Sequence, residues 1–488
     1  MQELPTALYQ AEQVRELDRL AIAEAGIAGF ELMRRAGRVV YQCLHRLWPK
    51  AQSIAVFCGS GNNAGDGFIV AELAIRAGLQ VRVYCLSDPD LLKGDALCAY
   101  HHYRNANGSI SLYQSEQEPS ADVLVDALFG TGLGRSISGL YLDAIKMINR
   151  SAAPVIAVDI PSGLNANTGA VMGEAIKADC TVSFIGLKQG LFTGHGPNYC
   201  GEIHYASLDV PDHLLARVLP SAYRVVQQPW PRRQRCAYKG DFGHVLIIGG
   251  CLGYSGAVRL AGEAALRIGA GLVSVATCCE HAVLLNSARP ELMCHGVQDA
   301  GQLEPLLAKA DVVVLGPGLG QSEWAKTLFW AALRAEKKMV IDADGLNILA
   351  QTTEKREHWV LTPHPGEAGR LLGCSTGDIQ QDRYVAASAL QQKYGGIVVL
   401  KGVGTLIAAR LSIAVSSTGN PGMASGGMGD VLAGVIAGLI AQGFSLPEAA
   451  QQGVYGHGWA ADRAAGIGGE RGLLASDLMP FIRQWANA

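Results

Sequence analysis

The stretch Asn420-Pro-Gly-Met-Ala-Ser-Gly-Gly-Met-Gly-Asp430 decides the fold of the second half of the chain. It is rich in glycine and runs into Val-Leu-Ala-Gly-Val-Ile-Ala-Gly-Leu-Ile-Ala, an apolar pattern of small residues that indicates a buried helix. Glycine lets the backbone approach a ligand closely, so that N–H groups converge on phosphate oxygens. The positive end of the following helix points at the same place. The stretch therefore predicts an anion-binding loop that begins a helix.

A single carboxylate, Asp430, closes this loop. An acid is a poor passive neighbour for phosphate because like charges repel. It is well placed, however, to take a proton from a hydroxyl that attacks phosphorus. The alternative is that Asp430 only caps the helix behind a flexible turn. We predict that Asp430 is a catalytic base.

The length of the chain, 488 residues, exceeds the size at which one hydrophobic core keeps growing, so two domains are expected. Short apolar strands alternate with helical segments in each half, which is typical of a doubly wound α/β sheet. A stretch dotted with prolines separates the halves and reads as a linker. We predict domains at residues 1–215 and 236–488, joined by a linker at 216–235.

The apolar periodicity places the elements within these domains. Two helices are predicted within residues 10–48. Strands are predicted at 53–58, 81–86, 122–126, 155–159 and 180–184, and then at 244–250, 271–277, 311–316, 339–342, 359–362 and 396–401.

Bulk composition excludes several classes of partner. The net charge of −3 and the lack of any Lys/Arg run argue against binding of nucleic acid. No apolar run is long enough to cross a bilayer, and the first residues lack a signal-peptide pattern. The twelve cysteines show no zinc-type spacing, which fits reduced thiols. We expect a cytoplasmic homo-oligomer with no nucleic-acid or membrane partner.

The first half carries its own glycine loop, Cys58-Gly-Ser-Gly-Asn-Asn-Ala-Gly-Asp-Gly67, between a predicted strand and a predicted helix. It satisfies the loose Gly-x-Gly-x-x-Gly/Ala pattern of dinucleotide loops. It also departs from that pattern, because the Asp66 carboxylate would occupy the anion site itself. Asn62 and Asn63 add amides that a pyrophosphate loop does not need. We infer a different ligand geometry.

Oxygen-bearing side chains follow three strands of this half. Asn63, Asp126 and Asp159 each come at or just after a strand end, and Ser162 follows soon after. Such ends converge on one crevice in an open α/β sheet. Oxygen ligands suit a hard cation better than zinc. Taken singly, each residue could instead form a turn or a helix cap; together they predict a ligand and cation site.

These motifs resemble the NAD(P)H-hydrate epimerase domain, which has a Rossmann-like fold. The motifs are Gly-Ser-Gly-Asn-Asn-Ala-Gly-Asp-Gly, Asp-Ala-Leu-Phe-Gly-Thr-Gly-Leu, Val-Asp-Ile-Pro-Ser-Gly, Arg-Glu-Leu-Asp-Arg and Leu-Met-Arg-Arg-Ala-Gly-Arg. The resemblance implies substrate contacts at Asn62, Asn63, Ala64, Gly65, Asp66, Gly130, Thr131, Gly132, Leu133, Gly134, Arg135, Ser136 and Asp159. It also implies a potassium ion (K⁺) held by Asn63, Asp126 and Ser162.

Inversion of the hydroxylated C6 carbon of the hydrate needs a group that moves protons. Asp159 is our candidate for this acid/base role, and Asp66 is the alternative. Ala64 stands where that family usually has glycine, which leaves the implied ligands intact.

The second half gathers further polar clusters at predicted strand ends. They are Gly249–Ala257, Gly316–Gly320, Asp342–Asn347, Leu361–Glu367 and Lys401–Thr405. A lysine and a hydroxyl beside glycines suit a nucleotide phosphate, although Lys401 could be a surface residue. His364 could be structural, but flanking prolines fix its direction and favour substrate contact. Asp342 and Asp344 are interpreted as helix caps and left out of the catalytic set.

This set resembles the ADP-dependent NAD(P)H-hydrate dehydratase, a ribokinase-like fold, and the whole chain resembles the bifunctional NAD(P)H-hydrate repair enzymes. The resemblance implies hydrate contacts at Ala257, Gly318, His364 and Asp430. It implies ADP contacts at Lys401, Gly402, Val403, Gly404, Thr405 and Gly429, with Mg²⁺ accompanying the nucleotide. Cys251 stands where serine is common in the first loop of the family.

The expected activity is repair of NADH hydrate and NADPH hydrate. The first domain would interconvert the R and S forms, and the second would dehydrate the S form with ADP through a phosphate ester that eliminates phosphate. One alternative is a ribokinase-like small-molecule kinase, of the thiamine-precursor type, fused to a nucleotide-binding domain. Another makes the first half a binding module that senses a nicotinamide nucleotide without acting on it.

Overall fold

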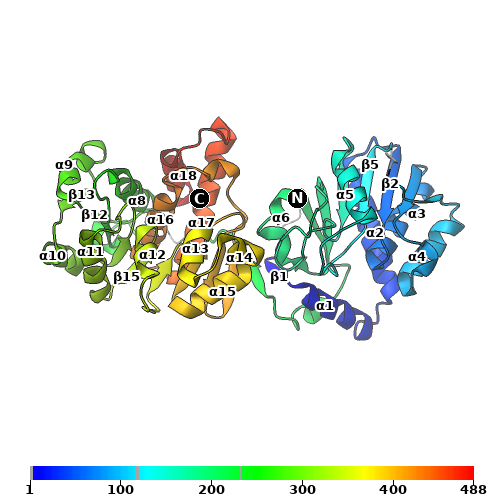
Figure 1. Ribbon diagram of the computed structural model, residues 1–488, viewed down its shortest axis with the longest axis horizontal. Helices are drawn as coiled ribbons and strands as arrows, with labels where there is room; N and C mark the ends of the chain where they lie inside the picture. The colour runs from blue at the N-terminus through cyan, green and yellow to red at the C-terminus, as the bar shows by residue number, and fades with distance from the viewer. Residues whose placement is uncertain (1–3, 116–119, 231, 488) are drawn as a thin grey trace. The chain divides into compact units, whose positions relative to one another are not determined.

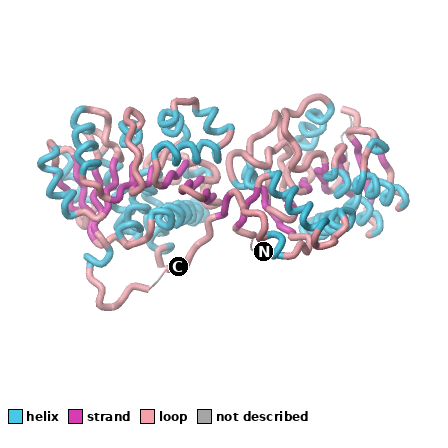
Figure 2. Tube along the Cα trace, turned by 90° about the horizontal axis from the view of Figure 1, so that it is seen from below, coloured by secondary structure: helices cyan, strands magenta, loops and turns pink. Residues whose placement is uncertain are grey.

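The computed structural model describes residues 4–115, 120–230 and 232–487. The chain divides into two compact units, Met1–Tyr223 (unit 1) and Arg224–Ala488 (unit 2). This division falls inside the predicted linker 216–235, of which residue 231 lies outside the described residues. Each unit is an α/β structure with helices on both sides of its strands (Figures 1 and 2).

Unit 1 is built on a parallel sheet with the strand order β4-β3-β2-β5-β6-β7-β9. The strands are β2 (Ser53–Cys58), β3 (Gln80–Cys85), β4 (Ile110–Leu112), β5 (Val123–Ala127), β6 (Val155–Val158), β7 (Cys180–Phe184) and β9 (Glu202–Ala206). The chain extends the sheet from β2 in one direction and then restarts at β5 on the other side of β2. The carboxyl ends of β2 and β5 therefore form a topological switch point, where open α/β sheets bind ligands.

Strand β2 illustrates how the sequence covers both faces of this sheet. Ile54, Val56 and Cys58 enter one hydrophobic core, whereas Ala55 and Phe57 enter the core on the opposite face. Successive side chains of a strand point to opposite faces, so a continuously apolar strand needs helices on both. The helices of unit 1 are α1 (Ala11–Ala23), α2 (Gly29–Leu47), α3 (Asn62–Arg76), α4 (Gly94–Asn105), α5 (Leu140–Arg150), α6 (Gly196–Tyr199) and α7 (Asp212–Leu215).

A short strand near the start of the chain joins distant parts of unit 1. Strand β1 (Ala7–Tyr9) pairs in parallel with β8 (Leu187–Lys188) and antiparallel with β10 (Ala222–Arg224). Tyr9 lies opposite Lys188 in this pairing. The pairing fixes the backbone from which the buried Lys188 side chain extends.

Unit 2 is built on strands in the order β13-β12-β11-β14-β15-β16-β17-β18-β19. They are β11 (His244–Ile248), β12 (Leu272–Thr277), β13 (Met293–Gly296), β14 (Val312–Leu315), β15 (Lys338–Ile341), β16 (Trp359–Leu361), β17 (Ile397–Leu400), β18 (Leu406–Ala409) and β19 (Ser412–Val415). Pairing is parallel from β13 to β17 and antiparallel for β18 and β19. The chain reverses direction across the sheet between β11 and β14, which forms a second switch point.

The apolar helix that follows the glycine loop is α16 (Met428–Ala441), which packs against α8 (Ser255–Ile268). A Cβ atom at Gly434 would lie 2.0 Å from the carbonyl oxygen of Ala261, so the close approach of these helices requires glycine there. The other helices of unit 2 are α9 (Cys279–Ala288), α10 (Ala300–Lys309), α11 (Glu323–Arg334), α12 (Asp344–Leu349), α13 (Pro365–Leu372), α14 (Thr376–Gln381), α15 (Arg383–Tyr394), α17 (Leu446–Gly468) and α18 (Met479–Trp485).

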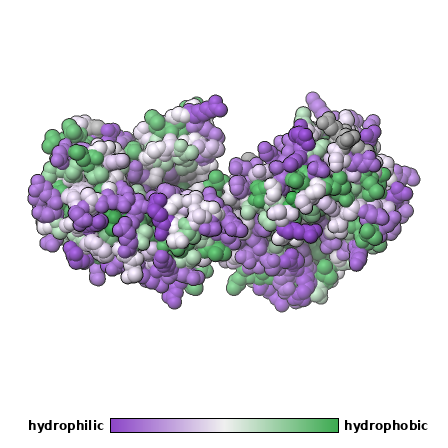
Figure 3. All heavy atoms as spheres, viewed as in Figure 1, coloured by the Kyte–Doolittle hydropathy of each residue, from purple (hydrophilic) through white to green (hydrophobic). Residues whose placement is uncertain are grey.

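The α/β fold with two doubly wound sheets is confirmed, and every predicted strand is present within about two residues of its predicted bounds. The sequence analysis missed the short strands β1, β4, β8 and β10, the edge strand β13, and β9, β18 and β19. Within the described ranges, no helix is long and apolar enough to cross a membrane. Hydrophilic and apolar side chains are interspersed on the viewed face of each unit (Figure 3).

Candidate active sites

A cavity of about 480 Å³ opens at the switch point of unit 1. Its lining includes the residues after β2, the turn after β5, the residue after β6, and side chains from α1 and α2. Members of the predicted substrate set that line it are Asn62, Asn63, Asp66, Gly130, Thr131, Gly132, Leu133 and Asp159. Ala64, Gly65, Gly134, Arg135 and Ser136 are outside this lining. The strand ends thus bring most of the predicted contacts to one cavity.

Asp159 occupies a strained position in this cavity. Its φ angle is 68°, in the left-handed region that non-glycine residues rarely adopt. The carboxylate forms an ion pair with Lys188 and accepts a hydrogen bond from the Phe184 backbone N–H at 3.2 Å. Lys188 is fully buried and also donates to Ser183 Oγ at 3.2 Å. These contacts hold the Asp159 side chain in one orientation.

Three further carboxyl groups line the same cavity, those of Asp18, Asp66 and Asp95. Burial, followed by the charges of Asp159 and Asp18, raises the pKa of Asp66 well above its usual range, against the opposing effect of Lys188. Burial also raises the pKa of Asp18 to about 6, with Lys188 opposing and Asp159 adding to the rise. The cavity therefore favours the protonated form of Asp66 near the Asp159–Lys188 ion pair.

Sequence reasoning did not identify Lys188 or Asp18 as site residues. Asp18 lies on α1, within the quoted Arg-Glu-Leu-Asp-Arg motif, and Lys188 ends β8. The motif around Asp18 could have identified this aspartate as a site residue. Lys188 lies outside the motifs quoted above, and its contact with Asp159 depends on the tertiary fold.

Of the residues of the predicted potassium site, Asn63 lines this cavity, whereas Asp126 and Ser162 form a buried pair outside its lining. Asp126 is fully buried and accepts hydrogen bonds from Ser162 Oγ at 2.6 Å and from the Ser162 backbone N–H at 2.8 Å. Ser162 Oγ in turn accepts from the Phe129 backbone N–H at 2.8 Å. Asn63 Oδ1 would lie 3.5 Å from a Cβ atom placed on Gly130, so its amide faces the turn after β5.

Two observations suit a cation at this place. The buried amide nitrogen of Asn63 has no hydrogen-bond partner among the described residues; a flipped amide would present its oxygen instead. Burial raises the pKa of Asp126 to about 6 despite hydrogen bonds from Ser162 and Leu128. A nearby cation would favour the charged form of Asp126 and would remove this penalty.

In unit 2 an ion pair joins the residue that follows β15 to the residue that follows β17. Lys401, directly after β17, donates from Nζ to Asp342 Oδ1 at 2.7 Å. The Thr362 hydroxyl donates to the same carboxylate oxygen at 2.8 Å. Asp342 is therefore a buried partner of Lys401, and its interpretation as a helix cap is wrong. The neighbouring Ala343 has a φ angle of 49°, so this site also contains backbone strain.

Asp430 lies in the first turn of α16, where the N-cap residue is Gly427. The alternative that Asp430 serves as the helix N-cap is therefore wrong. Burial raises the pKa of Asp430 to about 7, the charge of Asp342 adds to the rise, and Lys401 opposes it. A group with a pKa near neutrality can both accept and release a proton under physiological conditions.

Gly429 brings the helix start against the ion pair. A Cβ atom at this position would lie 3.2 Å from both Asp342 Oδ2 and Lys401 Nζ. Glu367 Oε2 lies 3.8 Å from the same Lys401 Nζ. Burial raises the pKa of Glu367 to about 7 against the effect of Lys401. Burial alone would lower the pKa of Lys401, but the surrounding carboxylates outweigh it and raise that pKa.

The predicted ADP contacts other than Gly429 form the turn between β17 and β18. Gly402 and Gly404 have φ angles of 137° and 61°, which favour glycine. The Thr405 hydroxyl donates to the Gly402 carbonyl at 2.9 Å, so it closes the turn. This conformation exposes part of Lys401 and brings its ammonium to the start of α16.

Two predicted hydrate contacts are adjacent. A Cβ atom at Gly318, whose φ angle is 55°, would lie 3.2 Å from Ala257 Cβ. His364 instead caps α13: its Nδ1 accepts from the Gly366 backbone N–H at 3.0 Å, and its Nε2 lies 3.4 Å from Glu367 Oε1. About half of the His364 side chain, 51%, is exposed.

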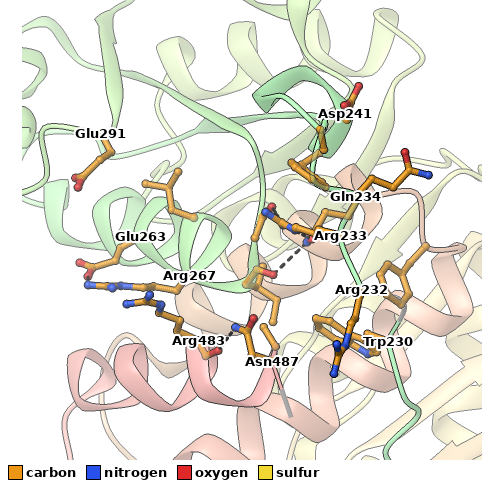
Figure 4. Close-up of a pocket in the computed structure, with 18 of the residues that line it drawn as sticks. Trp230, Arg232, Arg233, Gln234, Asp241, Glu263, Arg267, Glu291, Arg483 and Asn487 are labelled. Atoms are coloured by element: carbon orange, nitrogen blue, oxygen red, sulfur yellow. Dashed lines mark hydrogen bonds and ion pairs between the residues drawn. The ribbon is translucent and has the colours of Figure 1, made fainter.

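A larger cavity of unit 2, about 1030 Å³, contains none of these residues (Figure 4). Its arginines are largely engaged within the unit: Arg233 donates to the Gly269 carbonyl at 2.6 Å, and Arg267 and Arg289 both contact Glu263. These contacts cap a helix end and neutralise a buried acid. The cavity is separate from the cluster around Asp430.

Each unit thus gathers a lysine, an aspartate and further carboxyl groups with raised pKa at the carboxyl ends of parallel strands. Clustered titratable groups of this kind, in a switch-point crevice, define an enzyme with two candidate active sites.

Comparison with known proteins identifies the family. Residues 29–190 match the model for the YjeF-related protein N-terminus, and residues 245–483 match the model for NAD(P)H-hydrate dehydratase. Proteins named bifunctional NAD(P)H-hydrate repair enzyme Nnr are similar over almost the whole chain. The one from Coxiella burnetii is 49% identical over 487 residues, covering 99% of this chain and 100% of that protein. The one from Escherichia coli is 44% identical over 489 residues, covering 99% and 95%. The chain belongs to the family of bifunctional NAD(P)H-hydrate repair enzymes.

A solved structure is also similar to part of the chain. It is titled an ADP/ATP-dependent NAD(P)H-hydrate dehydratase from Bacillus subtilis, co-crystallised with ATP and Mg²⁺. It is 28% identical, has a TM-score of 0.47, and the match covers 52% of this chain and 93% of that chain.

Proposed function

We propose that unit 1 interconverts the R and S hydrates of NADH and NADPH, and that unit 2 dehydrates the S form with ADP. The observation that carries the dehydratase proposal is Asp430, whose pKa is raised to about 7. It sits in the first turn of a helix that begins in a glycine loop and approaches the Lys401–Asp342 ion pair. A base, a cation and a helix N-terminus at one place support attack of a hydroxyl on a phosphoryl group.

Hydroxide is a poor leaving group from C6 of the hydrated nicotinamide ring. We propose that Asp430 takes the proton of the C6 hydroxyl as its oxygen attacks the terminal phosphorus of ADP, and that the bond from this phosphorus to the bridging oxygen breaks to release AMP. The backbone N–H groups at the start of α16 and the Lys401 ammonium would stabilise the charge on the transferred group. The ring nitrogen then expels phosphate, and loss of a proton from C5 restores the reduced coenzyme.

Nucleotide binding would use the turn from Lys401 to Thr405, where Gly402 and Gly404 adopt positive φ angles. Their conformations let backbone N–H groups approach phosphate oxygens. We propose that Mg²⁺ enters with the phosphates, which are its usual ligands. The carboxylates of Asp342 and Glu367 lie near Lys401, and its positive charge balances part of their negative charge.

For unit 1 we propose an exchange of hydroxide at C6 through a planar ring cation. The protonated Asp66 would donate a proton to the departing hydroxide, and Asp159 would take a proton from the water that returns on the other face. Lys188 holds Asp159 in place through their ion pair. This assignment gives roles to both aspartates that the sequence left as alternatives.

We propose that Asn63, Asp126 and Ser162 hold K⁺. The orphaned amide of Asn63 and the buried carboxylate of Asp126 support this assignment. When bound, the ion would neutralise Asp126 and fix the turn that begins at Phe129. The substrate contacts at Gly130 to Leu133 follow directly in the chain, so the ion would order them. Epimerisation should then be faster in KCl than in LiCl of equal ionic strength.

The decisive experiment is incubation of the purified protein with NADPH hydrate and ADP. Recovery of the absorbance of NADPH, with one phosphate released per coenzyme, is the expected result. No recovery with either ADP or ATP would reject the dehydratase proposal. Accumulation of a stable phosphorylated product from a small alcohol such as a thiamine precursor would favour the kinase alternative.

The proposal for unit 1 is tested separately by the ratio of R to S hydrate without ADP. Full-length protein should bring this ratio to equilibrium far faster than it changes spontaneously. Binding without any acceleration would favour the sensing module instead.

A further inference from the structure

Two cysteines and a histidine that are distant in sequence meet on unit 1. The sulfur atoms of Cys43 and Cys180 and a ring nitrogen of His204 lie within 4.8 Å of one another. Cys43 is on α2, Cys180 is the first residue of β7, and His204 is on β9. Their spacing along the chain contains no zinc motif, so the tertiary fold alone creates this group.

A cationic group already contacts two of the three side chains. The Arg46 guanidinium donates to Cys43 Sγ at 3.4 Å, and one of its nitrogens lies 3.1 Å from His204 Nδ1. Because Arg46 can only donate, Nδ1 must accept and must therefore carry a lone pair. Arg46 is exposed, so its long side chain can move into solvent and leave this position to another cation.

The second ring nitrogen of His204 has a carboxylate partner. Glu202 Oε1 lies 3.2 Å from Nε2, which fits a hydrogen on Nε2. A metal-bound histidine commonly donates its other ring N–H to a carboxylate, which fixes the tautomer and the ring orientation.

We infer that Cys43, Cys180 and His204 form a binding site for a soft or borderline divalent metal ion, with Zn²⁺ as the natural occupant. Two thiolates and one imidazole are a ligand set that zinc uses, with water completing the tetrahedron. Metal–ligand bonds of about 2.0–2.3 Å place the ligand atoms of such a site roughly 3.3–3.8 Å apart. The observed ligand atoms lie within 4.8 Å of one another, so each pair needs to contract by at most about 1.0–1.5 Å.

The position of the site gives the ion a structural role. Cys180 opens β7, whereas Asp159 follows the end of β6, and these neighbouring strands are parallel. The metal site is therefore at the opposite end of the sheet from the epimerase cavity. Bound metal ties α2 to β7 and β9, and the first turns of α2 line that cavity. Metal should stabilise unit 1 without entering the reaction.

The test uses the reduced, metal-free, full-length protein titrated with Co²⁺, which reports tetrahedral thiolate ligation by its absorption. The expected result is one equivalent of Co²⁺ with sulfur-to-cobalt charge-transfer bands, displaced by Zn²⁺. Cys43→Ser and Cys180→Ser should lose these bands. Cys85→Ser, which alters another buried cysteine of the same sheet, should retain them.

Zinc should raise the melting temperature of the wild type and of Cys85→Ser but not that of the two site variants. If the site variants fail to fold, alkylation of the wild type decides: Zn²⁺ should protect Cys43 and Cys180, as mapped by mass spectrometry. Unprotected thiols, unchanged cobalt bands in the site variants, or a Cys43–Cys180 disulfide in a protein that takes up no metal when reduced would each overturn the assignment.

Discussion

The two candidate active sites share a plan and differ in one respect. Each pairs a lysine with an aspartate that follows a parallel strand, Lys188 with Asp159 and Lys401 with Asp342. Each adds a carboxyl group whose pKa is raised by burial. In unit 2 that group, Asp430, is on a helix that begins in a glycine loop. In unit 1 the corresponding Asp66 is inside α3, where its carboxyl group occupies the region that an anion would use.

This difference separates two kinds of chemistry. A base beside an open helix N-terminus and a lysine can assist transfer of a phosphoryl group. A protonated acid beside an ionised carboxylate can exchange protons but cannot bind phosphate well, because like charges repel. Each site contains a non-glycine residue with a positive φ angle, which is Asp159 in unit 1 and Ala343, beside Asp342, in unit 2. In our proposal the ion pair positions each site, and the added carboxyl group, Asp66 or Asp430, determines the reaction.

The largest expected effect comes from removing the base of unit 2. Asp430→Asn should lower the rate of dehydration by about 10³-fold or more, because the amide cannot take the hydroxyl proton. Nucleotide binding should remain, since the turn from Lys401 to Thr405 is unchanged. Phosphate release and calorimetric titration with ADP measure the two properties. Turnover within tenfold of the wild type would show that Asp430 is not the base.

Substitution of the aspartates of unit 1 should have the next largest effect. Asp159→Asn and Asp66→Asn should each slow epimerisation by roughly 10²–10⁴-fold, which is the usual contribution of a general acid or base. Both should leave dehydration of pure S hydrate unchanged. The R to S ratio, followed by chromatography, measures the rate. If Asp66→Asn epimerises normally while Asp159→Asn does not, Asp159 acts alone.

Lowering the pH should change the rate of dehydration less than the substitutions above do. Dehydration requires ionised Asp430, so its kcat/KM should fall about tenfold per pH unit below the pKa of about 7 and level off above it. The sign follows because lowering the pH protonates the base. In Asp430→Asn, the residual kcat/KM for dehydration should no longer fall below pH 7. If kcat/KM of that variant falls in the same way at acidic pH, the group that titrates is not Asp430.

The smallest effect should be on stability alone. Gly434→Ala places a Cβ atom 2.0 Å from the Ala261 carbonyl, so α8 and α16 must move apart. The expected loss is about 1–3 kcal/mol in the free energy of unfolding. The matched control is Gly466→Ala in α17, where a Cβ atom meets no neighbour. Urea denaturation should show a normal or slightly raised stability for this control.

The sequence predicted those features that depend on local pattern. The periodicity of apolar residues predicted the strands, and polar residues near strand ends predicted Asn63, Asp126 and Ser162 as site residues. In the fold, Asp126 pairs with Ser162, and Asn63 faces the turn after β5. The family predicted from the motifs is confirmed by the matches over both halves. The cation, nucleotide and catalytic assignments stay predictions.

Features that depend on long-range contacts could not be predicted. Asp342 was interpreted as a cap because a strand-end aspartate commonly caps the next helix, whereas its partner Lys401 is 59 residues away. Lys188 lies 29 residues beyond Asp159 and has no motif of its own. Cys43, Cys180 and His204 come from three separate elements. Only the packing of the fold reveals such partners.

The most direct test of the two-site account is the extent of repair of a mixture of R and S NADPH hydrates with excess ADP. The wild type should restore all of the NADPH absorbance. Asp159→Asn should stop, apart from slow spontaneous epimerisation, once the S fraction is consumed, and Asp430→Asn should restore none while still equilibrating R and S. Complete and rapid repair by Asp159→Asn, or loss of epimerisation in Asp430→Asn, would contradict the account.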